Sequence, residues 1–405
     1  MIRLNAAGMT LVAVLVMFTA GTGCAAVPQE RTPAFRPAAP QTAPAADGVP
    51  SRASGAEHPA PAPASTSTPG PGPGSGPAVA YPWHPGRPEL GVQVYWDDNS
   101  SESAELIRIK ARQVVDYVVD LEANAICVSF PFFTDTVRSN AVHGARSTPT
   151  PERLGILLDE ARHSGLRVTL RPTLDERNLT AANRLDWRGT IRPIDRNAWF
   201  ASYRRFLTPY LALAERTGAA TMVIGTELNS LEGDPRWTDL AAYARTLFSG
   251  ETGYAFNWDV FVHTTVRMPV DRVGVDAYPE LPLPDDASVE ELAAGWNAWL
   301  DRRARGTIPG LLLYEVGAPA QDGIYRHPAN PNNGGPVNEV VQQRWFTAAC
   351  RMARERALAG LYWWRVDFHV DPSTVDPLRD RHESFAGRAA EQTIRDCFST
   401  WRAVR

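Results

Sequence analysis

Two glutamates, Glu227 and Glu315, each end a short apolar run in this 405-residue sequence. The runs are VIGT at residues 223–226 and LLLY at residues 311–314. Such runs are typical of strands that are buried on both faces, where a charged group is costly to desolvate. Because paired carboxylates are the catalytic groups of glycoside hydrolysis, the two glutamates predict an active site for that chemistry.

The elements that must position the two glutamates are strand-like runs separated by amphipathic helical patterns. Strands are expected at 91–96, 125–133, 167–173, 221–228, 254–258, 272–278, 310–316 and 360–366, and helices at 103–121, 151–164, 197–217, 235–249, 288–305, 337–357 and 383–398. The connection at 259–271 is short, with room for a turn or so of helix. This alternation predicts an α/β protein with a parallel sheet, and its repetition predicts a (β/α)8 TIM barrel. An open doubly wound sheet is the alternative, although no GxGxxG follows the first run.

Active sites of such barrels lie at the carboxyl ends of the strands. The residues expected there are mostly aromatic, amide or carboxylate in type, and as candidate substrate-binding residues we select Trp96, Arg171, Asn229, Asn257, Trp258, Asp276, Tyr278, Trp363 and Trp364. Because side chains alternate along a strand, only one of the two neighbouring tryptophans can point inward. Sugars stack on aromatic rings and need polar partners for their hydroxyls, so this set suits a saccharide cleft better than a hydride- or phosphate-transfer site.

These motifs resemble those of clan A (β/α)8 glycoside hydrolases, most closely the family-113 β-mannanases. The resemblance covers most of residues 89–405 and rests on IGTEL at 224–228, YEVG at 314–317, YAFNWD at 254–259, VGVDAY at 273–278 and GLYWW at 360–364. It implies that Glu227 is the acid/base on the fourth strand and that Glu315 is the nucleophile on the seventh. It also implies a retaining mechanism, with a β-mannan-type polymer as the leading substrate.

The sequence departs from the pattern of these relatives at three positions. Thr226 stands where many clan A enzymes have asparagine, and Arg171 and Thr173 lie where the mannanase-like pattern has a lysine and a histidine. All three positions concern the sugar-binding side of the predicted site.

The two predicted roles require different surroundings for the two carboxyl groups. Glu227 must stay protonated near neutral pH, whereas Glu315 must be kept ionised by hydrogen bonds. Tyr278 is a candidate hydrogen-bond donor to Glu315. Arg171 could likewise lower the pKa of a neighbouring carboxylate.

The N-terminus resembles a bacterial lipoprotein signal at residues 1–23. Arg3 precedes a short apolar core at 11–20, and GTGC at 21–24 places small residues before Cys24. The core is too short to span a bilayer in the mature protein. We expect Cys24 to be lipidated and to anchor the protein to the cell membrane at the cell surface. Ordinary secretion with cleavage near Ala25 or Ala26 is the alternative, and both predict an extracytoplasmic protein.

Residues 24–88 are rich in proline, alanine and glycine, as in PAPAPA at 59–64 and PGPGPG at 69–74. Such a segment has too little apolar surface to offset the entropy of ordering, which predicts a disordered tether. The remaining residues, 89–405, fit one barrel domain, for which about 250 residues is typical and insertions are common.

The cysteines, the net charge and the short motifs indicate which disulfides, metals, cofactors and partners to expect. Cys127 is expected in the core, whereas Cys350 and Cys397 fall in the last two predicted helices. There they could form a disulfide in an oxidising compartment or remain free thiols, since sequence does not show their geometry. No CxxC or HExxH is present, and the net charge is −4. We therefore expect no metal, no cofactor and no nucleic-acid partner, and a monomeric protein whose partner is a β-glycan.

Three functions agree with these patterns. The first is a retaining β-glycoside hydrolase, and the second is an envelope-glycan transglycosylase of the same fold. The third is a non-catalytic glycan-binding surface lipoprotein, against which the presence of both glutamates argues.

Overall fold

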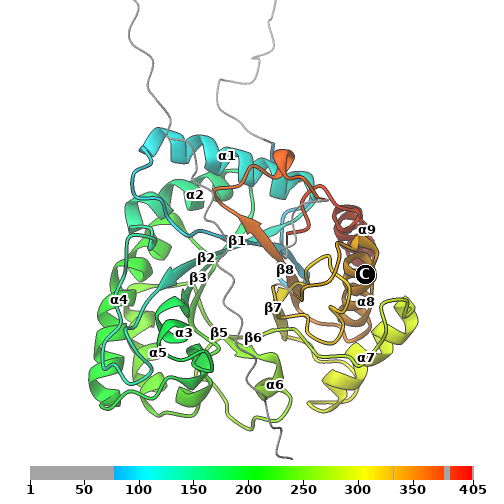
Figure 1. The fold of residues 1–405 in the computed structure, drawn as a ribbon. Coiled ribbons are helices and arrows are strands. Elements are labelled where there is room, and N and C mark those ends of the chain that lie inside the picture. Colours follow the sequence, from blue (N-terminus) through cyan, green and yellow to red (C-terminus); the bar gives the residue numbers. More distant parts are fainter. Residues whose placement is uncertain (1–76, 332, 378–383, 404–405) are drawn as a thin grey trace, which may run out of the picture. The chain divides into compact units, whose positions relative to one another are not determined.

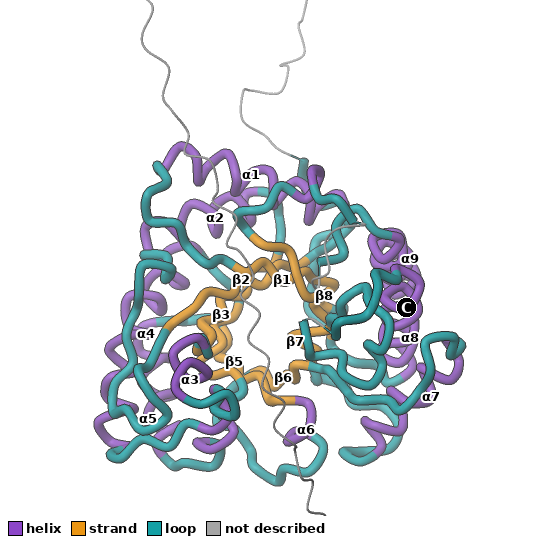
Figure 2. Tube along the Cα trace, in the orientation of Figure 1, coloured by secondary structure: helices purple, strands orange, loops and turns teal. Residues whose placement is uncertain are grey.

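The computed structural model describes residues 77–331, 333–377 and 384–403, and these residues form one closed barrel of eight parallel strands (Figures 1 and 2). The strands are β1 (Glu89–Tyr95), β2 (Ala125–Phe132), β3 (Arg167–Leu174), β4 (Thr221–Thr226), β5 (Glu251–Asn257), β6 (Arg272–Asp276), β7 (Leu312–Val316) and β8 (Gly360–Asp367). Each strand pairs with its neighbours in chain order, and β1 pairs with β8 to close the barrel. The predicted TIM barrel is confirmed.

Helices surround the ring of strands (Figure 2). They are α1 (Ala104–Asp120), α2 (Pro151–His163), α3 (Arg177–Ala182), α4 (Arg196–Thr217), α5 (Arg236–Leu247), α6 (Trp258–Phe261), α7 (Val289–Asp301), α8 (Glu339–Glu355) and α9 (Ala389–Ala403). Short polar side chains begin several of them, because they accept hydrogen bonds from backbone N–H groups that the helix leaves free. Ser103 caps α1 in this way, and Ser288 and Glu291 form a reciprocal capping box at α7. In the described part of the chain, no helix combines the length and apolar character needed to cross a membrane.

Two tyrosines fill the interior of the barrel below its carboxyl end. Tyr314 of β7 and Tyr362 of β8 are fully buried there with Cys127. Glycines on neighbouring strands make room for both rings. A Cβ atom at Gly274 would lie 2.2 Å from the Tyr314 ring, and one at Gly91 would lie 2.2 Å from the Tyr362 ring. The barrel is therefore a packed core, and a ligand can enter only above these rings.

The last twelve residues of the segment expected to be a tether, 77–88 of 24–88, are described by the structure, and part of this stretch packs on the barrel. The backbone N–H of Val79 donates to the carbonyl of Ser164 at 2.8 Å, and the Arg167 guanidinium lies 4.0 Å from the centre of the Trp83 ring. These side chains have apolar surface to bury, which the proline-rich part lacks. The signal peptide, Cys24 and the rest of the tether lie outside the described residues.

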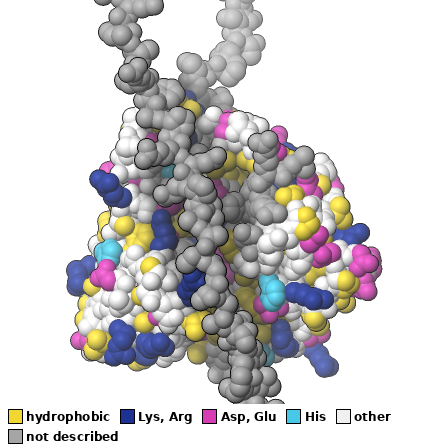
Figure 3. Space-filling view, in the orientation of Figure 1, with side chains coloured by type: hydrophobic (Ala, Val, Ile, Leu, Met, Phe, Trp, Pro, Cys, Tyr) yellow, Lys and Arg dark blue, Asp and Glu magenta, His cyan; other side chains and the backbone are white. Residues whose placement is uncertain are grey.

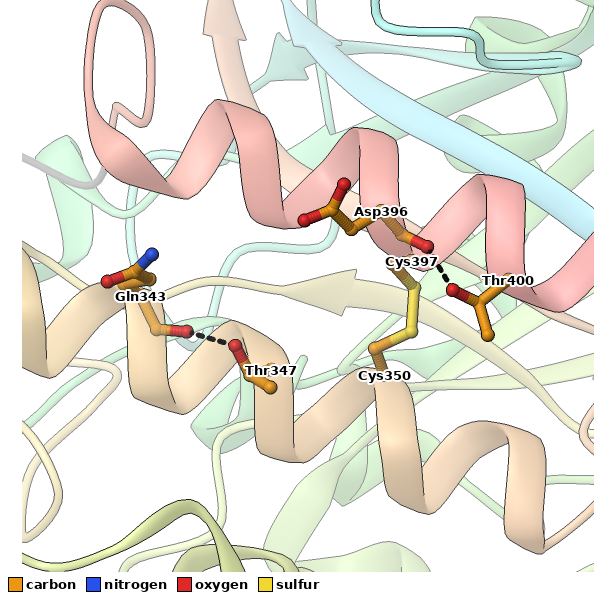
Figure 4. The surroundings of a disulfide bond; sticks show 6 residues. All are labelled: Gln343, Thr347, Cys350, Asp396, Cys397 and Thr400. Atoms are coloured by element: carbon orange, nitrogen blue, oxygen red, sulfur yellow. Dashed lines mark hydrogen bonds between the residues drawn. A yellow bond between two sulfur atoms is a disulfide. The ribbon is translucent and has the colours of Figure 1, made fainter.

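A disulfide joins the last two helices of the barrel (Figure 4). Cys350 of α8 and Cys397 of α9 have Cα atoms 5.9 Å apart, so of the two alternatives left open by the sequence the structure has the bonded one. Cys127 is buried and unpaired among the cysteines that the structure describes.

The connection between β3 and α4 contains two elements that the sequence did not predict. These are α3 (Arg177–Ala182) and the 3-10 helix η1 (Arg188–Thr190). Two further 3-10 turns, η2 (Asn229–Leu231) and η3 (Pro372–Thr374), follow β4 and β8. The β3–α4 connection matters most here, because it supplies one wall of the cleft described below.

Candidate active site

A cleft of about 350 Å³ opens among the carboxyl ends of the strands and contains both glutamates. Its walls include five aromatic side chains, which are Tyr95, Trp187, Trp258, Tyr278 and Trp364. Carboxylates and arginines complete much of the lining. Around the face drawn in Figure 3, acidic and basic side chains of the described residues are interspersed, so that face has no single charge sign.

Glu315 near the end of β7 is held by two donors. Its Oε1 atom lies 2.5 Å from Nη1 of Arg171, and its Oε2 accepts a hydrogen bond from the Tyr278 hydroxyl at 2.7 Å. The residue is only 6% exposed but lines the cleft. Charge-assisted hydrogen bonds stabilise a carboxylate, so both oxygens of Glu315 are held as an anion would require. The expectation that Tyr278 donates to Glu315 agrees with this geometry.

Arg171 of β3 lies below the cleft, fully buried between two carboxylates. Its Nη2 atom is 2.5 Å from Oδ2 of Asp276 at the end of β6. Burial raises the pKa of Asp276 well above its ordinary value, and Arg171 opposes that effect. Neither Arg171 nor Asp276 belongs to the cleft lining. Both were selected as substrate-binding residues; in the structure Arg171 contacts Glu315, and Asp276 contacts Arg171.

Glu227 follows β4, and its carboxyl group accepts hydrogen bonds from other residues than those that contact Glu315. Its Oε1 accepts a hydrogen bond from Nδ2 of Asn257 at 2.8 Å, and its Oε2 accepts one from Nη1 of Arg188 at 3.2 Å. The Asn257 amide is oriented because its Oδ1 accepts from the backbone N–H of Asp259 at 3.2 Å. Burial raises the pKa of Glu227 to about 7; Arg188 opposes this effect and the charge of Glu315 adds to it.

The backbone of Glu227 is also unusual. Its φ angle is 51°, in the left-handed region that residues other than glycine rarely adopt. The backbone N–H of Glu227 donates to the carbonyl of Ala255 on β5 at 2.8 Å. Such a conformation costs of order 1–3 kcal/mol and persists where surrounding contacts enforce it, commonly at functional sites. The strand ends at Thr226, and this turn is what presents the Glu227 side chain to the cleft.

Sequence reasoning missed Arg188 and Trp187, which line the cleft from the β3–α4 connection together with Glu176. Arg188 lies between Glu227 and Glu176, with its Nε 2.9 Å from Oε1 of Glu176. Trp187 folds back over Gly189, where a Cβ atom would lie 2.4 Å from the indole ring. This connection shows no hydrophobic period, so the only signal for these residues was their proximity in sequence to the predicted third strand.

The remaining predicted residues divide into two groups. Asn257, Trp258, Tyr278 and Trp364 line the cleft together with Glu227 and Glu315. Trp96, Asn229 and Trp363 do not, so the structure does not place them as substrate contacts.

The two excluded tryptophans are core residues. Trp96 is fully buried, stacks on Phe368 with ring centres 3.8 Å apart, and donates its indole N–H to Asp98 at 3.0 Å. Trp363 is fully buried and stacks on Phe346 of α8 with ring centres 4.5 Å apart. Asn229 begins the turn η2 beyond the end of β4. As side-chain alternation requires, only one member of the Trp363–Trp364 pair reaches the cleft.

No cluster of three or more His, Cys, Asp or Glu side chains is arranged to hold a metal ion within residues 77–331, 333–377 and 384–403. The lining of the cleft offers carboxyl, hydroxyl and guanidinium groups. A buried carboxyl group with a raised pKa opposite a carboxylate held by donors is the arrangement that glycosidases use.

A parallel barrel with two such carboxyl groups at its carboxyl end defines the class as a glycoside hydrolase of the TIM-barrel type. The model of Glycoside Hydrolase Family 113 matches residues 98–381, and the chain belongs to that family. The resemblance recognised in the sequence is confirmed. No match was found among curated proteins.

Solved structures of this family, and one from another glycoside hydrolase family, share the fold. The GH113 β-mannanase AaManA from Alicyclobacillus acidocaldarius, in complex with ManMIm, is 22% identical, with a TM-score of 0.63 over 78% of this chain and 98% of that chain. A GH113 β-1,4-mannanase is 19% identical, with a TM-score of 0.65 over 78% and 99%. A variant of a GH5_18 protein from Streptomyces cattleya, in complex with Manb1-4GlcNAc, is 14% identical, with a TM-score of 0.51 over 78% and 82%. At these identities the likeness concerns the fold.

Proposed function

We propose that this glycoside hydrolase cleaves β-mannan-type polysaccharides or oligosaccharides with retention of configuration, using Glu227 as acid/base and Glu315 as nucleophile. One observation carries the proposal. The two carboxyl groups line one cleft in different environments. Glu315 lies 2.5 Å from the fully buried Arg171 guanidinium and accepts a hydrogen bond from Tyr278. Glu227, by contrast, accepts from the Asn257 amide and, at 3.2 Å, from Arg188, and burial raises its pKa to about 7. One group is thus prepared to be an anion and the other to carry a proton.

The proposed reaction has two steps. In the first, the Glu315 carboxylate attacks the anomeric carbon, and Glu227 gives its proton to the glycosidic oxygen as that bond breaks. This leaves a glycosyl ester on Glu315 and a carboxylate on Glu227. In the second step, Glu227 takes a proton from water, the water oxygen attacks the anomeric carbon, and Glu315 leaves as a carboxylate.

The hydrogen bonds to Glu315 serve both steps. Arg171 and Tyr278 aim its two oxygens before substrate binds, so little of this orientation must be achieved during the reaction. In the second step the negative charge returns to Glu315, and the same donors stabilise it as a leaving group. Asp276 keeps Arg171 in place through the other arm of the guanidinium.

The cleft walls support a sugar substrate. Tyr95 and Trp364 lie edge to face with ring centres 5.9 Å apart on the β1–β8 side, and Trp258 follows Asn257 on the opposite side. Apolar faces of sugar rings stack on such side chains. The two GH113 structures named above are described as β-mannanases, which supports mannan as the leading polymer.

We propose further that the protein acts outside the cytoplasm, anchored through lipidated Cys24 or secreted. The Cys350–Cys397 disulfide supports this location, because disulfides form and persist in oxidising compartments. Substitution of Cys24 by alanine should release the protein from the membrane fraction of the expressing cells. Retention of the C24A variant in that fraction would contradict the lipid anchor.

The direct test is hydrolysis of a panel of β-glycans, including mannan, glucomannan, cellulose and xylan oligosaccharides. We expect wild-type protein to release short products from the mannans, with the β-anomer appearing first in an NMR time course. First appearance of the α-anomer would contradict retention, and products longer than the substrate would identify a transglycosylase. Binding of mannan with no turnover would identify a glycan-binding protein.

A further inference from the structure

We propose that Arg188 is a positioning residue whose guanidinium shifts between Glu227 and Glu176 as Glu227 loses and regains a proton. The inference rests on the proposed role of Glu227 as acid/base and adds a group through which that role is regulated. Arg188 lies in the β3–α4 connection, outside the strand-end motifs.

The geometry that carries the inference is one cation between two carboxyl groups. Nη1 of Arg188 lies 3.2 Å from Oε2 of Glu227, and Nε of the same guanidinium lies 2.9 Å from Oε1 of Glu176. The backbone N–H of Arg188 also donates to Oε1 of Glu176 at 3.4 Å. Glu176 therefore holds both the backbone and the side chain of Arg188 within reach of the cleft.

The protonation state of Glu227 decides which partner Arg188 can keep. A guanidinium only donates hydrogen bonds, so Oε2 of Glu227 cannot carry a proton directed at Nη1 and keep the present contact. Oε1 already accepts from Asn257. When Glu227 carries the proton, the guanidinium of Arg188 pairs with Glu176. When Glu227 becomes a carboxylate, Arg188 can stabilise it with a charge-assisted hydrogen bond.

Several other charged groups act on Glu227, but among the described residues Arg188 is the cation that forms an ion pair with it. Glu315 on β7, Arg171 on β3, Asp276 on β6 and Glu176 influence it from a greater distance, as does Glu232 after η2. Burial has the largest effect on the pKa of Glu227 and raises it. Arg188 lowers it, and Glu176 raises it. Removing Arg188 takes away the cation that contacts Glu227, whereas removing the Glu176 charge leaves that cation to Glu227 alone. We therefore expect the pKa of Glu227 to rise in the first case and to fall in the second.

The test measures the ionisation of Glu227 directly, by NMR titration of isotope-labelled glutamate carboxyl carbons. The E227Q variant assigns the resonance. We expect the midpoint of Glu227 to rise by about one unit in R188M and to fall in E176Q, since a contacting opposite charge shifts a carboxyl pKa by about 1–3 units. The R177M variant is the matched control, because Arg177 lies on the same connection but pairs with Asp97 and Asp175. Its Glu227 midpoint should equal that of the wild type.

Opposite shifts would support the inference, and a purely structural role of Arg188 would not produce them. Unchanged midpoints, or midpoints that move in the same direction in R188M and E176Q, would overturn it. The alkaline limb of kcat/KM against pH should follow the NMR midpoints in both variants. If the shifts occur but wild-type protein hydrolyses no β-glycan, the proposed function fails while the exchange of Arg188 between two carboxyl groups stands.

Discussion

Nη1 of Arg171 lies 2.5 Å from Oε1 of Glu315, at a point where the arginine has no exposed surface. An arginine is always charged, so a buried one must be matched by carboxylates, and here Glu315 and Asp276 match it. The orientation of Glu315 is thus part of the folded core and does not depend on substrate. Removing one member of such a buried group leaves an uncompensated charge, which typically costs about 3–5 kcal/mol.

Replacing Glu315 by glutamine should abolish turnover while the fold is retained. The amide preserves the shape of the side chain but cannot act as a nucleophile, so kcat on mannan should fall by about a thousandfold or more. Circular dichroism should report an unchanged barrel. The D97N variant is a control, because Asp97 is a rim carboxylate that pairs with Arg177 and does not line the cleft. Hydrolysis at the wild-type rate by E315Q would remove Glu315 from the mechanism.

The pH dependence of kcat/KM follows from the raised pKa of Glu227, which is about 7. The first step needs the protonated form, so activity should be lost as pH rises through this value. The loss should approach about tenfold per unit at higher pH. Initial rates at low substrate concentration across the pH range measure this limb. A rate that stays constant or increases up to about pH 9 would contradict a protonated Glu227 as the acid.

Thr173 of β3 has a hydroxyl that the fold itself does not use. The residue is 5% exposed and lines the cleft, and its Oγ1 has no hydrogen-bond partner in the described part of the chain. We expect this hydroxyl to bond a substrate hydroxyl. The T173V variant should therefore lose about fivefold in kcat/KM, because one hydrogen bond contributes roughly 1 kcal/mol. Its melting temperature should be unchanged or higher, since an unsatisfied polar atom is removed.

The matched control for this variant is Thr169 on the same strand. Its hydroxyl lies 3.4 Å from that of Tyr362 inside the barrel and is not part of the cleft. The T169V variant should keep the wild-type kcat/KM. Equal kcat/KM values for T173V and wild type would show that Thr173 does not contact substrate.

The strands and the two glutamates could be predicted from sequence because their signals are local. Each strand is an apolar run buried between the barrel interior and the helices, and Glu227 and Glu315 are charged residues at the ends of such runs. The end of the first strand could not be predicted to one residue. It ends at Tyr95, whose ring lines the cleft, whereas the neighbouring Trp96 packs in the core. A shift of one residue exchanges the two faces of a strand.

The cleft residues of the β3–α4 connection could not be predicted from the sequence. Arg188 and Trp187 reach the cleft because the intervening chain makes contacts with distant residues, such as Glu227 from β4. No period or spacing in the sequence encodes those contacts. The backbone strain at Glu227 is likewise visible only once the fold imposes it.

The disulfide should stabilise the barrel without affecting catalysis. Cys350 and Cys397 are 47 residues apart in sequence, and cross-linking such a loop typically contributes about 2–4 kcal/mol to the free energy of unfolding. The C350A/C397A double variant should lose stability of this order in denaturant titrations. Its kcat should match the wild type, because no residue of α8 or α9 lines the cleft. An equal free energy of unfolding would contradict a stabilising disulfide.

The most direct test of the central claim is covalent trapping of the nucleophile. A fluorinated β-mannoside with an activated leaving group should form the glycosyl ester and hydrolyse it slowly, so that the intermediate accumulates. Mass spectrometry of the digested protein should then find one added fluoromannosyl group, on Glu315. Attachment to another residue, or rapid turnover with an inverted product and no adduct, would contradict the assignment of Glu315 as the nucleophile of a retaining enzyme.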